Sequence, residues 1–336
     1  MKPIIFVIAI LPLIVTAQEK VSTKTILPQI ESITSDTLNG ICKAIFFEYD
    51  QLKRVSSISV KKIEIKKGSE PVETFIKVQN FQYKQNEQLP FASHTYNYDY
   101  EDIRFSRERD GQSQQIQYFQ FKNGKRIGDS TIYQEYEQLV KDAKFDDSIS
   151  KKRLATFVQT PTKLIREMEL SIKEPGRPHS ERFYIDSFVI TTKQNISFES
   201  SEHFIYNHDN PKTDFTFTQF DKAINPLHQL NIAPLISNEK ITLAFGSDEM
   251  QQIGKCIDGL GTEFDWYYLN QNNPLNYKFE RGETESPFED IIRLSYTYNQ
   301  YNQPTYCKSL VKKIFKKDNG RLAGTYKKSF TFRYKL

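Results

Sequence analysis

The sequence predicts an all-β fold, an antiparallel meander of repeated β-hairpins that forms a large curled or partly closed barrel-like sheet. The clearest hairpin lies near the end of the chain. In residues 291–298, apolar and aromatic side chains alternate with polar ones, which is the two-residue period of a half-buried strand. Turn-forming residues follow at 299–304, and a return strand over 306–315 completes the hairpin. Residues 329–336 repeat the alternation, so we expect one more strand there.

The composition shows mixed charge rather than a surface of one sign. The chain has 46 basic and 42 acidic residues and a net charge of +4. A nucleic-acid-binding protein would need a basic stripe, so we expect no nucleic-acid partner. The 25 Phe and 19 Tyr residues are typical of strands in which aromatic side chains pair across neighbouring strands.

The start of the chain predicts a targeting segment. A basic residue, an apolar run and small residues precede an expected cleavage after Ala17. The apolar run is shorter than the roughly 20 residues of a membrane-spanning helix. We therefore expect a signal peptide over 1–17, a leader segment over 18–40 and a single β-repeat domain over 41–336. Such a protein is exported by the secretory pathway to the periplasm or the cell surface.

Alternating runs continue through the first half of the domain. Residues 58–65 keep the two-residue period except for a slip by one residue, which a β-bulge near 61–62 explains. Further strands are expected over 73–83 and 94–100. The Lys-Asn-Gly sequence at 122–124 predicts a hairpin turn.

Two segments depart from simple alternation. In residues 132–145 the apolar positions suit a period of 3.6 residues, which predicts one short helix. Residues 181–192 are apolar on both faces, which predicts a strand covered on both sides.

The three cysteines allow one internal disulfide in an oxidising compartment. Cys42, Cys256 and Cys307 can pair in three ways on sequence alone, and Cys256 with Cys307 closes the shortest loop. The alternative, three reduced and partly buried thiols, is equally compatible with the sequence.

Several units resemble known repeats. Residues 47–55 and 318–322 look like the Tyr-Asp hairpin repeats of bacterial surface proteins. Residues 220–235, 267–279 and 296–305 are similar to an exported, β-rich family of Bacteroidetes whose domain of unknown function is described as porin-like in fold. The resemblance implies a curled antiparallel sheet and carries over no reaction or catalytic residues. Many family members are lipoproteins, whereas this chain has no cysteine at the expected cleavage site.

The sharpest candidate for chemistry lies in one short stretch. In a strand, Glu263 and Asp265 project from one face, beside Trp266, Tyr267 and Tyr268. Two carboxylates about 5–10 Å apart are what glycoside hydrolysis needs. The same residues fit an ordinary strand with a solvated acidic face, which is the favoured interpretation. A non-catalytic ligand surface comes next, and a glycan-active enzyme that uses Glu263 and Asp265 comes last. We expect no catalytic residues, cofactor or metal elsewhere.

Two functions then remain ahead of the enzyme. The first is an exported, non-catalytic β-repeat protein that binds or scaffolds an envelope glycan or protein. The alternative is an integral outer-membrane β-barrel, because the alternation over 329–336 resembles a closing strand. Membrane barrels need repeated strands of about 9–11 residues with an apolar outer face, and residues 73–83 and 113–121 place polar residues on both faces. The sequence therefore favours the first function and leaves membrane association open as the less favoured alternative.

Overall fold

The structure is a computed structural model. It describes residues 27–98, 112–123, 125–136, 150–173, 179–204, 212–232, 259–262, 264–281, 288–316 and 321–336.

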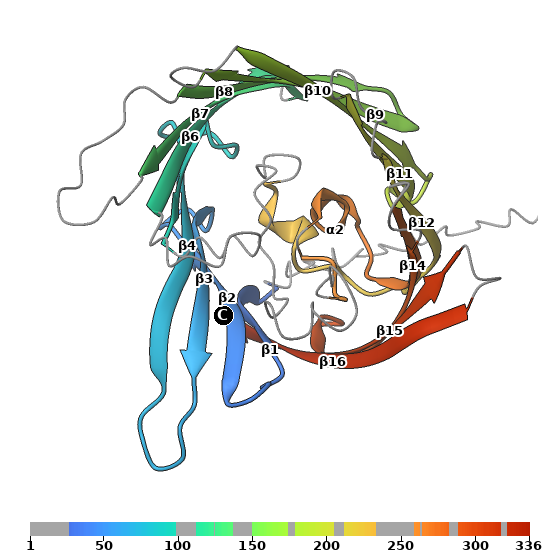
Figure 1. The fold of residues 1–336 in the computed structure, drawn as a ribbon. Coiled ribbons are helices and arrows are strands. Elements are labelled where there is room, and N and C mark those ends of the chain that lie inside the picture. The colour runs from blue at the N-terminus through green and yellow to red at the C-terminus, as the bar shows by residue number, and fades with distance from the viewer. Residues whose placement is uncertain are drawn as a thin grey trace, which may run out of the picture.

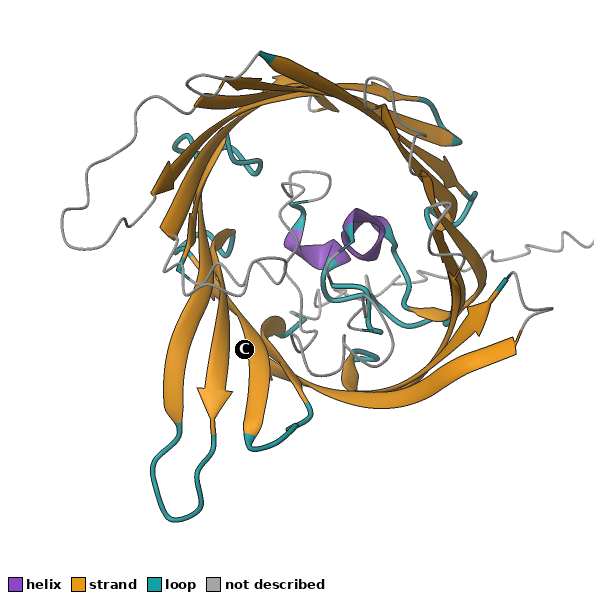
Figure 2. Ribbon diagram, in the orientation of Figure 1, coloured by secondary structure: helices purple, strands orange, loops and turns teal. Residues whose placement is uncertain are grey.

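Within these residues the chain forms sixteen strands, one short α-helix and one 3₁₀ turn (Figures 1 and 2). The strands are β1 (Gln29–Ser35), β2 (Ile41–Tyr49), β3 (Val55–Glu64), β4 (Val72–Gln82), β5 (Ala92–Asn97), β6 (Gln112–Lys122), β7 (Lys125–Tyr136), β8 (Ser150–Gln159), β9 (Lys163–Lys173), β10 (Ser180–Ile190), β11 (Ile196–Phe204), β12 (Lys212–Phe220), β13 (Pro274–Arg281), β14 (Phe288–Tyr298), β15 (Pro304–Phe315) and β16 (Arg321–Lys335). The 3₁₀ turn is η1 (His228–Leu230), and the α-helix is α2 (Asp265–Leu269). No helix in this part of the chain is both long and apolar enough to cross a membrane.

The strands form a closed barrel. Each strand pairs with its neighbour in sequence in the antiparallel sense, and β1 pairs with β16, where Ile33 lies opposite Phe332. The sheet was expected to be curled or partly closed, and it is fully closed. The barrel also begins earlier than expected, because β1 lies inside the predicted leader segment over 18–40. Pairing of β1 with β2 and β16 satisfies the backbone groups that would otherwise form two exposed sheet edges.

The predicted hairpin over residues 291–315 is confirmed. β14 and β15 pair in register from Phe288 opposite Phe315 to Tyr298 opposite Pro304. The predicted irregularity near residues 61–62 is present as a register shift between Val60 and Lys61 in the β3–β4 pairing. The extra residue belongs to the partner strand β4, because Val60 lies opposite Lys77 and Lys61 opposite Phe75.

The expected helix over 132–145 is wrong where the structure describes it. Residues 132–136 belong to β7, and residues 137–149 lie outside the described part of the chain. Ile132 pairs with Ile116 on β6 and with Lys152 on β8. Backbone hydrogen bonds to two neighbouring strands outweigh a local helical period.

The disulfide considered between Cys256 and Cys307 stays a prediction, because Cys256 lies outside the described residues. Cys42 and Cys307 are both buried. Cys307 is fully buried in the inward face of β15, opposite Phe330 on β16, where it packs as a small apolar side chain.

The inner wall over β1–β3 and β12–β16 is mostly apolar, although it also buries Asp290, Lys313 and Lys328. Inward side chains of β1–β3 and β12–β16 pack against the interior segments that carry η1 and α2, and together they form a continuous core. Its members on the wall include Ile33, Ile45, Phe47, Ile58, Phe215, Phe217, Tyr277, Ile292, Val311, Phe330 and Phe332. Leu227, Leu230, Ile232, Leu260 and Trp266 reach it from the interior segments. In the view along the barrel axis, α2 lies inside the ring of strands (Figure 1).

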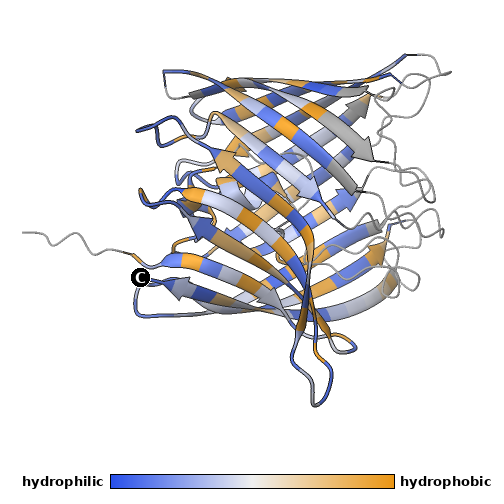
Figure 3. Ribbon diagram, turned by 90° about the vertical axis from the view of Figure 1, so that its left-hand side faces the viewer, coloured by the Kyte–Doolittle hydropathy of each residue, from blue (hydrophilic) through white to orange (hydrophobic). Residues whose placement is uncertain are grey.

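Hydrophilic and hydrophobic residues alternate along the strands (Figure 3). The outward residues form two sectors of different polarity. On β6–β10 many outward side chains are large and apolar, and Leu154 and Val158 on β8 are 49% and 58% exposed. Glu167 and Glu169 interrupt this apolar sector on β9. On β12–β16 the outward side chains are mostly polar, and the charged ones are Lys212, Asp214, Lys278, Glu280, Glu289, Arg293, Lys308, Lys312, Lys327, Arg333 and Lys335.

The strand expected to be covered on both faces lies in the apolar outer sector. β10 buries Asp186 and Phe188 on its inner face, but Phe183 and Val189 on its outer face are 47% and 38% exposed. The prediction of two covered faces is therefore wrong for this chain alone. The apolar outer face follows from closure of the barrel, which leaves one side of every strand outside.

Candidate functional site in the barrel interior

A group of charged side chains lies on another part of the inner wall, among core residues such as Phe157 and Phe188. The charged residues are inward residues of five consecutive strands, β7–β11, and each is less than 9% exposed. This charged wall consists of Arg126, Asp129, Arg153, Arg166, Asp186 and Glu199. Cross-strand pairing brings them together, since Asp186 lies opposite Arg166 and Arg166 opposite Phe157.

The first group of the charged wall holds two arginines around one carboxylate. Arg126 pairs with Asp129 on the same strand, and Nη2 of Arg153 lies 3.3 Å from Oδ1 of Asp129. Arg153 Nη2 also donates to Oγ1 of Thr131 at 3.1 Å. The Arg126 guanidinium lies 4.4 Å from the ring centroid of Phe157, an electrostatically favourable contact with the face of the ring.

This first group contains buried hydrogen-bond donors that are not satisfied by the described residues. Nε and Nη1 of both Arg126 and Arg153 are buried and have no hydrogen-bond partner within the described part of the chain. Buried polar groups are nearly always paired, so four such donors mark a place that a polar ligand or water can satisfy.

The second group holds one arginine among three carboxylates. Nη2 of Arg166 lies 2.6 Å from Oδ2 of Asp186, and its Nη1 lies 2.5 Å from Oδ2 of Asp265 on α2. Glu199 faces the same place, and its Oε2 is buried with no hydrogen-bond partner among the residues that the structure describes. Burial raises the pKa of Asp265 above its usual range, although Arg166 acts in the opposite direction.

Four of the five residues that the sequence analysis proposed as a ligand surface lie on helix α2. They were expected on a strand, but Asp265–Leu269 is helical and lies inside the barrel. Asp265 binds Arg166, whereas Glu263 lies outside the described residues. Trp266, Tyr267 and Tyr268 are at most 1% exposed. The ligand surface proposed for these five residues stays a prediction, and it requires the three aromatic side chains to become accessible.

The three aromatic residues anchor α2 to the wall. The ring of Trp266 lies 4.8 Å from that of Phe217 on β12 and 4.9 Å from that of Tyr277 on β13, both edge-to-face. Gly261 approaches so closely that a Cβ at this position would lie 2.1 Å from Cη2 of Trp266. These contacts fix the position of Asp265 opposite Arg166.

The Asn-Pro corners that carry the family resemblance meet at one end of the interior segment. Nδ2 of Asn225 donates to the backbone oxygens of Tyr267 and Asn270, at 2.6 and 2.8 Å. The hydroxyl of Tyr298 donates to Oδ2 of Asp221 at 2.5 Å. The corners at 220–225, 270–274 and 298–303 are thus a structural clamp on the segment that carries α2.

Sequence reasoning missed the charged wall. Its signal was weak but present, because Asp186 and Arg166 each stand inside a strand whose neighbouring inward residues are apolar, such as Phe188 and Leu164. The guanidinium and carboxylate groups of this wall pair with one another and can orient a charged or polar ligand. In the described part of the chain, no group of three or more His, Cys, Asp and Glu side chains is placed to hold a metal ion.

Comparison with known protein families and with curated proteins finds no match. Among solved structures, the chain is similar to a porin-like protein from Bacteroides vulgatus, with 8% identity and a TM-score of 0.44, and to a porin-like protein from Bacteroides uniformis, with 12% identity and a TM-score of 0.45. Each likeness covers 91% of this chain and 98% of the other. Likenesses this distant carry no argument about function, and the description of the barrel rests on the strand pairing of this chain.

Proposed function

We propose that this protein is an integral outer-membrane β-barrel. The observation that carries the proposal is the closure of all sixteen described strands, each paired with its neighbours, into a barrel without a free edge. A bilayer offers no water to backbone groups, so the structures that cross it are helices and closed barrels. An even number of antiparallel strands is usual for bacterial barrels of this kind.

The polarity of β6–β10 supports the proposal. These strands turn charged and polar side chains inward, such as Arg153 and Gln117, and large apolar side chains outward, such as Leu154 and Tyr118. Polar inside and apolar outside is the arrangement of a barrel in lipid. Between the two functions that the sequence left open, closure and this polarity favour the membrane barrel over the scaffolding protein.

The interior of the proposed barrel is occupied rather than empty. η1 and α2 lie inside the ring, and the Arg166–Asp265 ion pair joins α2 to the charged wall. A barrel of this kind is a plugged one, in which the interior segment controls what can pass.

A second candidate is a barrel that stays in water and binds or scaffolds an envelope glycan or protein. The observation that favours it is the charged outer face of β12–β16. An outward Lys or Arg costs about 2–4 kcal/mol at the bilayer midplane. In the membrane proposal, this sector must therefore contact water or a polar neighbour rather than acyl chains.

Fractionation of the native host separates the two candidates. Membranes are washed with carbonate, and the protein is followed through the outer-membrane, periplasmic and culture fractions, with gel migration compared before and after boiling. We expect a carbonate-resistant species whose migration changes on boiling. Recovery only in water-soluble fractions would reject the membrane barrel and favour the second candidate.

A further inference from the structure

Four cations surround one leucine on the outer face of β14–β16. Leu310 on β15 lies opposite Arg293 on β14 and opposite Lys327 on β16. Lys308 and Lys312 precede and follow it by two residues on β15, so they share its outward face. All four charged side chains are exposed.

The spacing allows these side chains to converge. Directly opposed residues in an antiparallel pair have Cβ atoms about 4.5–5.5 Å apart. Residues two apart on a strand are separated by about 7 Å. The long side chains of Arg293, Lys308 and Lys327 can therefore reach one small ligand above Leu310.

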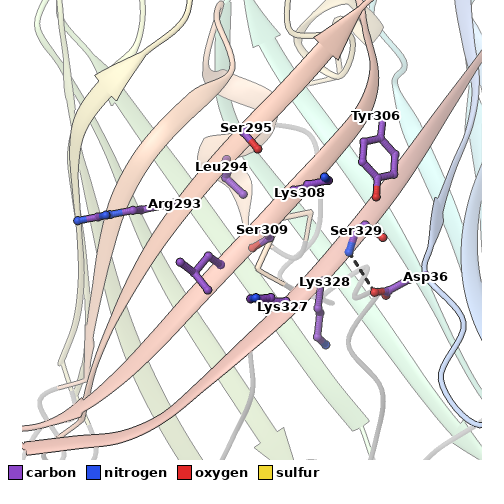
Figure 4. A pocket seen from close by; sticks show the side chains of 11 residues that line it. Asp36, Arg293, Leu294, Ser295, Tyr306, Lys308, Ser309, Lys327, Lys328 and Ser329 are labelled. Atoms are coloured by element: carbon purple, nitrogen blue, oxygen red, sulfur yellow. Dashed lines mark hydrogen bonds between the residues drawn. The ribbon is translucent and has the colours of Figure 1, made fainter.

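A hollow of about 560 Å³ lies at this place (Figure 4). Arg293, Lys308 and Lys327 line it together with hydroxyl-bearing side chains, and Leu310 contributes an apolar surface. Outward hydroxyl groups in the lining come from Ser295, Tyr306 and Ser329, whereas Ser309 is buried and its hydroxyl donates to the backbone oxygen of Gly259.

Two carboxylates lie near the hollow, and each already has an interaction partner within the protein. Asp36 borders the hollow, where its Oδ2 accepts the backbone N–H of Ser329 at 3.1 Å (Figure 4). Glu289 on β14 lies 2.8 Å from the Nζ of Lys278. Among the described residues, no ion pair joins Arg293, Lys308 or Lys327 to a carboxylate. Like charges on neighbouring strands destabilise a sheet, so a bound anion would relieve their repulsion.

We propose that this hollow binds a phosphorylated saccharide. A phosphate group carries nearly two negative charges and three terminal oxygens, so it can bond to three cations at once. The Arg293 guanidinium offers a fork of two N–H donors, and Lys308 and Lys327 act as point charges. Hydroxyl groups of Ser295, Ser329 and Tyr306 can then exchange hydrogen bonds with the sugar. This site does not depend on the proposed function, since it lies on the charged outer sector in either environment.

Titration calorimetry on the purified, folded chain tests the site. The probes are glucose 6-phosphate, inorganic phosphate and glucose, and the variants are Lys308→Gln, Lys327→Gln and Arg293→Gln. Lys67→Gln is the matched control, because Lys67 is exposed in the turn between β3 and β4. We expect one saturable site for glucose 6-phosphate, at least tenfold weaker binding in each of the three variants, no change in the control and no binding of glucose.

Each other outcome overturns a stated part of the inference. Binding of glucose 6-phosphate that is unaffected by the three variants, or equally weakened by Lys67→Gln, would reject the site. Inorganic phosphate that binds as tightly as glucose 6-phosphate would reject the contribution of the sugar. Thermal unfolding without ligand provides a second readout, since Lys308→Gln removes repulsion and should unfold at the same or a higher temperature than the parent chain.

Discussion

Arg166 on β9 and Asp265 on α2 form an ion pair of 2.5 Å inside the barrel. Both side chains are almost fully removed from solvent, and the same guanidinium binds Asp186 on β10. The pair joins an interior segment to a wall strand about 100 residues away in the sequence. The next residue on α2, Trp266, adds aromatic contacts to Phe217 on β12 and Tyr277 on β13.

Replacement of Arg166 should be costly. Arg166→Met leaves Asp186, Asp265 and Glu199 buried without their cation, and breaking a buried pair in this way typically costs about 3–5 kcal/mol. Urea-induced unfolding, followed by the fluorescence of Trp266, measures the change in free energy of unfolding. Arg182→Met on β10, where the arginine is exposed, is the control and should be nearly neutral. Equal effects of the two substitutions would contradict a stabilising role for the pair.

Replacement of Asp265 should be mild at neutral pH. Because burial raises the pKa of Asp265 in the folded state, its charged form destabilises the fold relative to its neutral form. Asp265→Asn should therefore be as stable as the parent chain, or more stable, at pH 7. As the pH falls through the raised pKa, the parent takes up a proton in the folded state and the difference between the two chains shrinks. A difference that grows in acid would contradict this account, and unfolding midpoints from pH 7 to pH 4 measure it.

Two glycines with positive φ offer a matched test of packing around α2. Gly261 has φ +99° and lies against the Trp266 ring, whereas Gly68 has φ +80° and open space around it. Both alanine substitutions meet the backbone strain of a left-handed conformation, but only Gly261→Ala also forces Trp266 to move. We expect Gly261→Ala to cost about 1–3 kcal/mol more than Gly68→Ala. Equal unfolding free energies for the two variants would show that Trp266 does not pack against residue 261.

The turn between β2 and β3 provides a pH-dependent contribution outside the strands. Oδ1 of Asp50 accepts the backbone N–H groups of Leu52 and Arg54, both at 2.9 Å, and Oδ2 accepts Nε–H of Arg54 at 2.7 Å. Burial alone would raise the pKa of Asp50, but these hydrogen bonds and the Arg54 charge outweigh it and lower the pKa below its usual 3.8.

Asp50→Asn should therefore destabilise the protein by about 1 kcal/mol at pH 7, since the turn is partly exposed to solvent. The contribution of the carboxylate is complete above the usual pKa and is lost as the pH falls through the lowered one. Unfolding measurements should show a constant difference between pH 5 and pH 8 and a smaller one below about pH 4. A constant difference down to pH 2 would mean that the carboxylate charge plays no part.

Local patterns predicted the strands well where one face of the strand is apolar and the turn that follows contains strong turn-forming residues. The alternation over 291–298 and the fixed φ of Pro304 determine the β14–β15 hairpin, and the inward face of β16 follows from Phe330 and Phe332. The same patterns could not show closure, because pairing of β1 with β16 joins residues about 300 positions apart.

The structure of the barrel interior was harder to predict from the sequence. Residues 264–269 look like the start of a strand, and only the clamp made by Asn225 and the aromatic wall of β12–β13 explains why they form a helix inside the barrel. The charged wall was missed for the same reason. Arg153 and Asp129 lie on different strands and become partners only through the register of the β7–β8 pairing.

The most direct test of the membrane account is a depth measurement at Leu154. The chain is prepared with its three native cysteines replaced by alanine and one new cysteine, Leu154→Cys on the apolar sector or Lys308→Cys on the charged sector. Each is labelled with an environment-sensitive fluorophore and folded into vesicles whose acyl chains carry a nitroxide quencher. The account predicts strong quenching of the label at position 154 and little at position 308. Absence of quenching at position 154, with protein recovered free of vesicles, would contradict it.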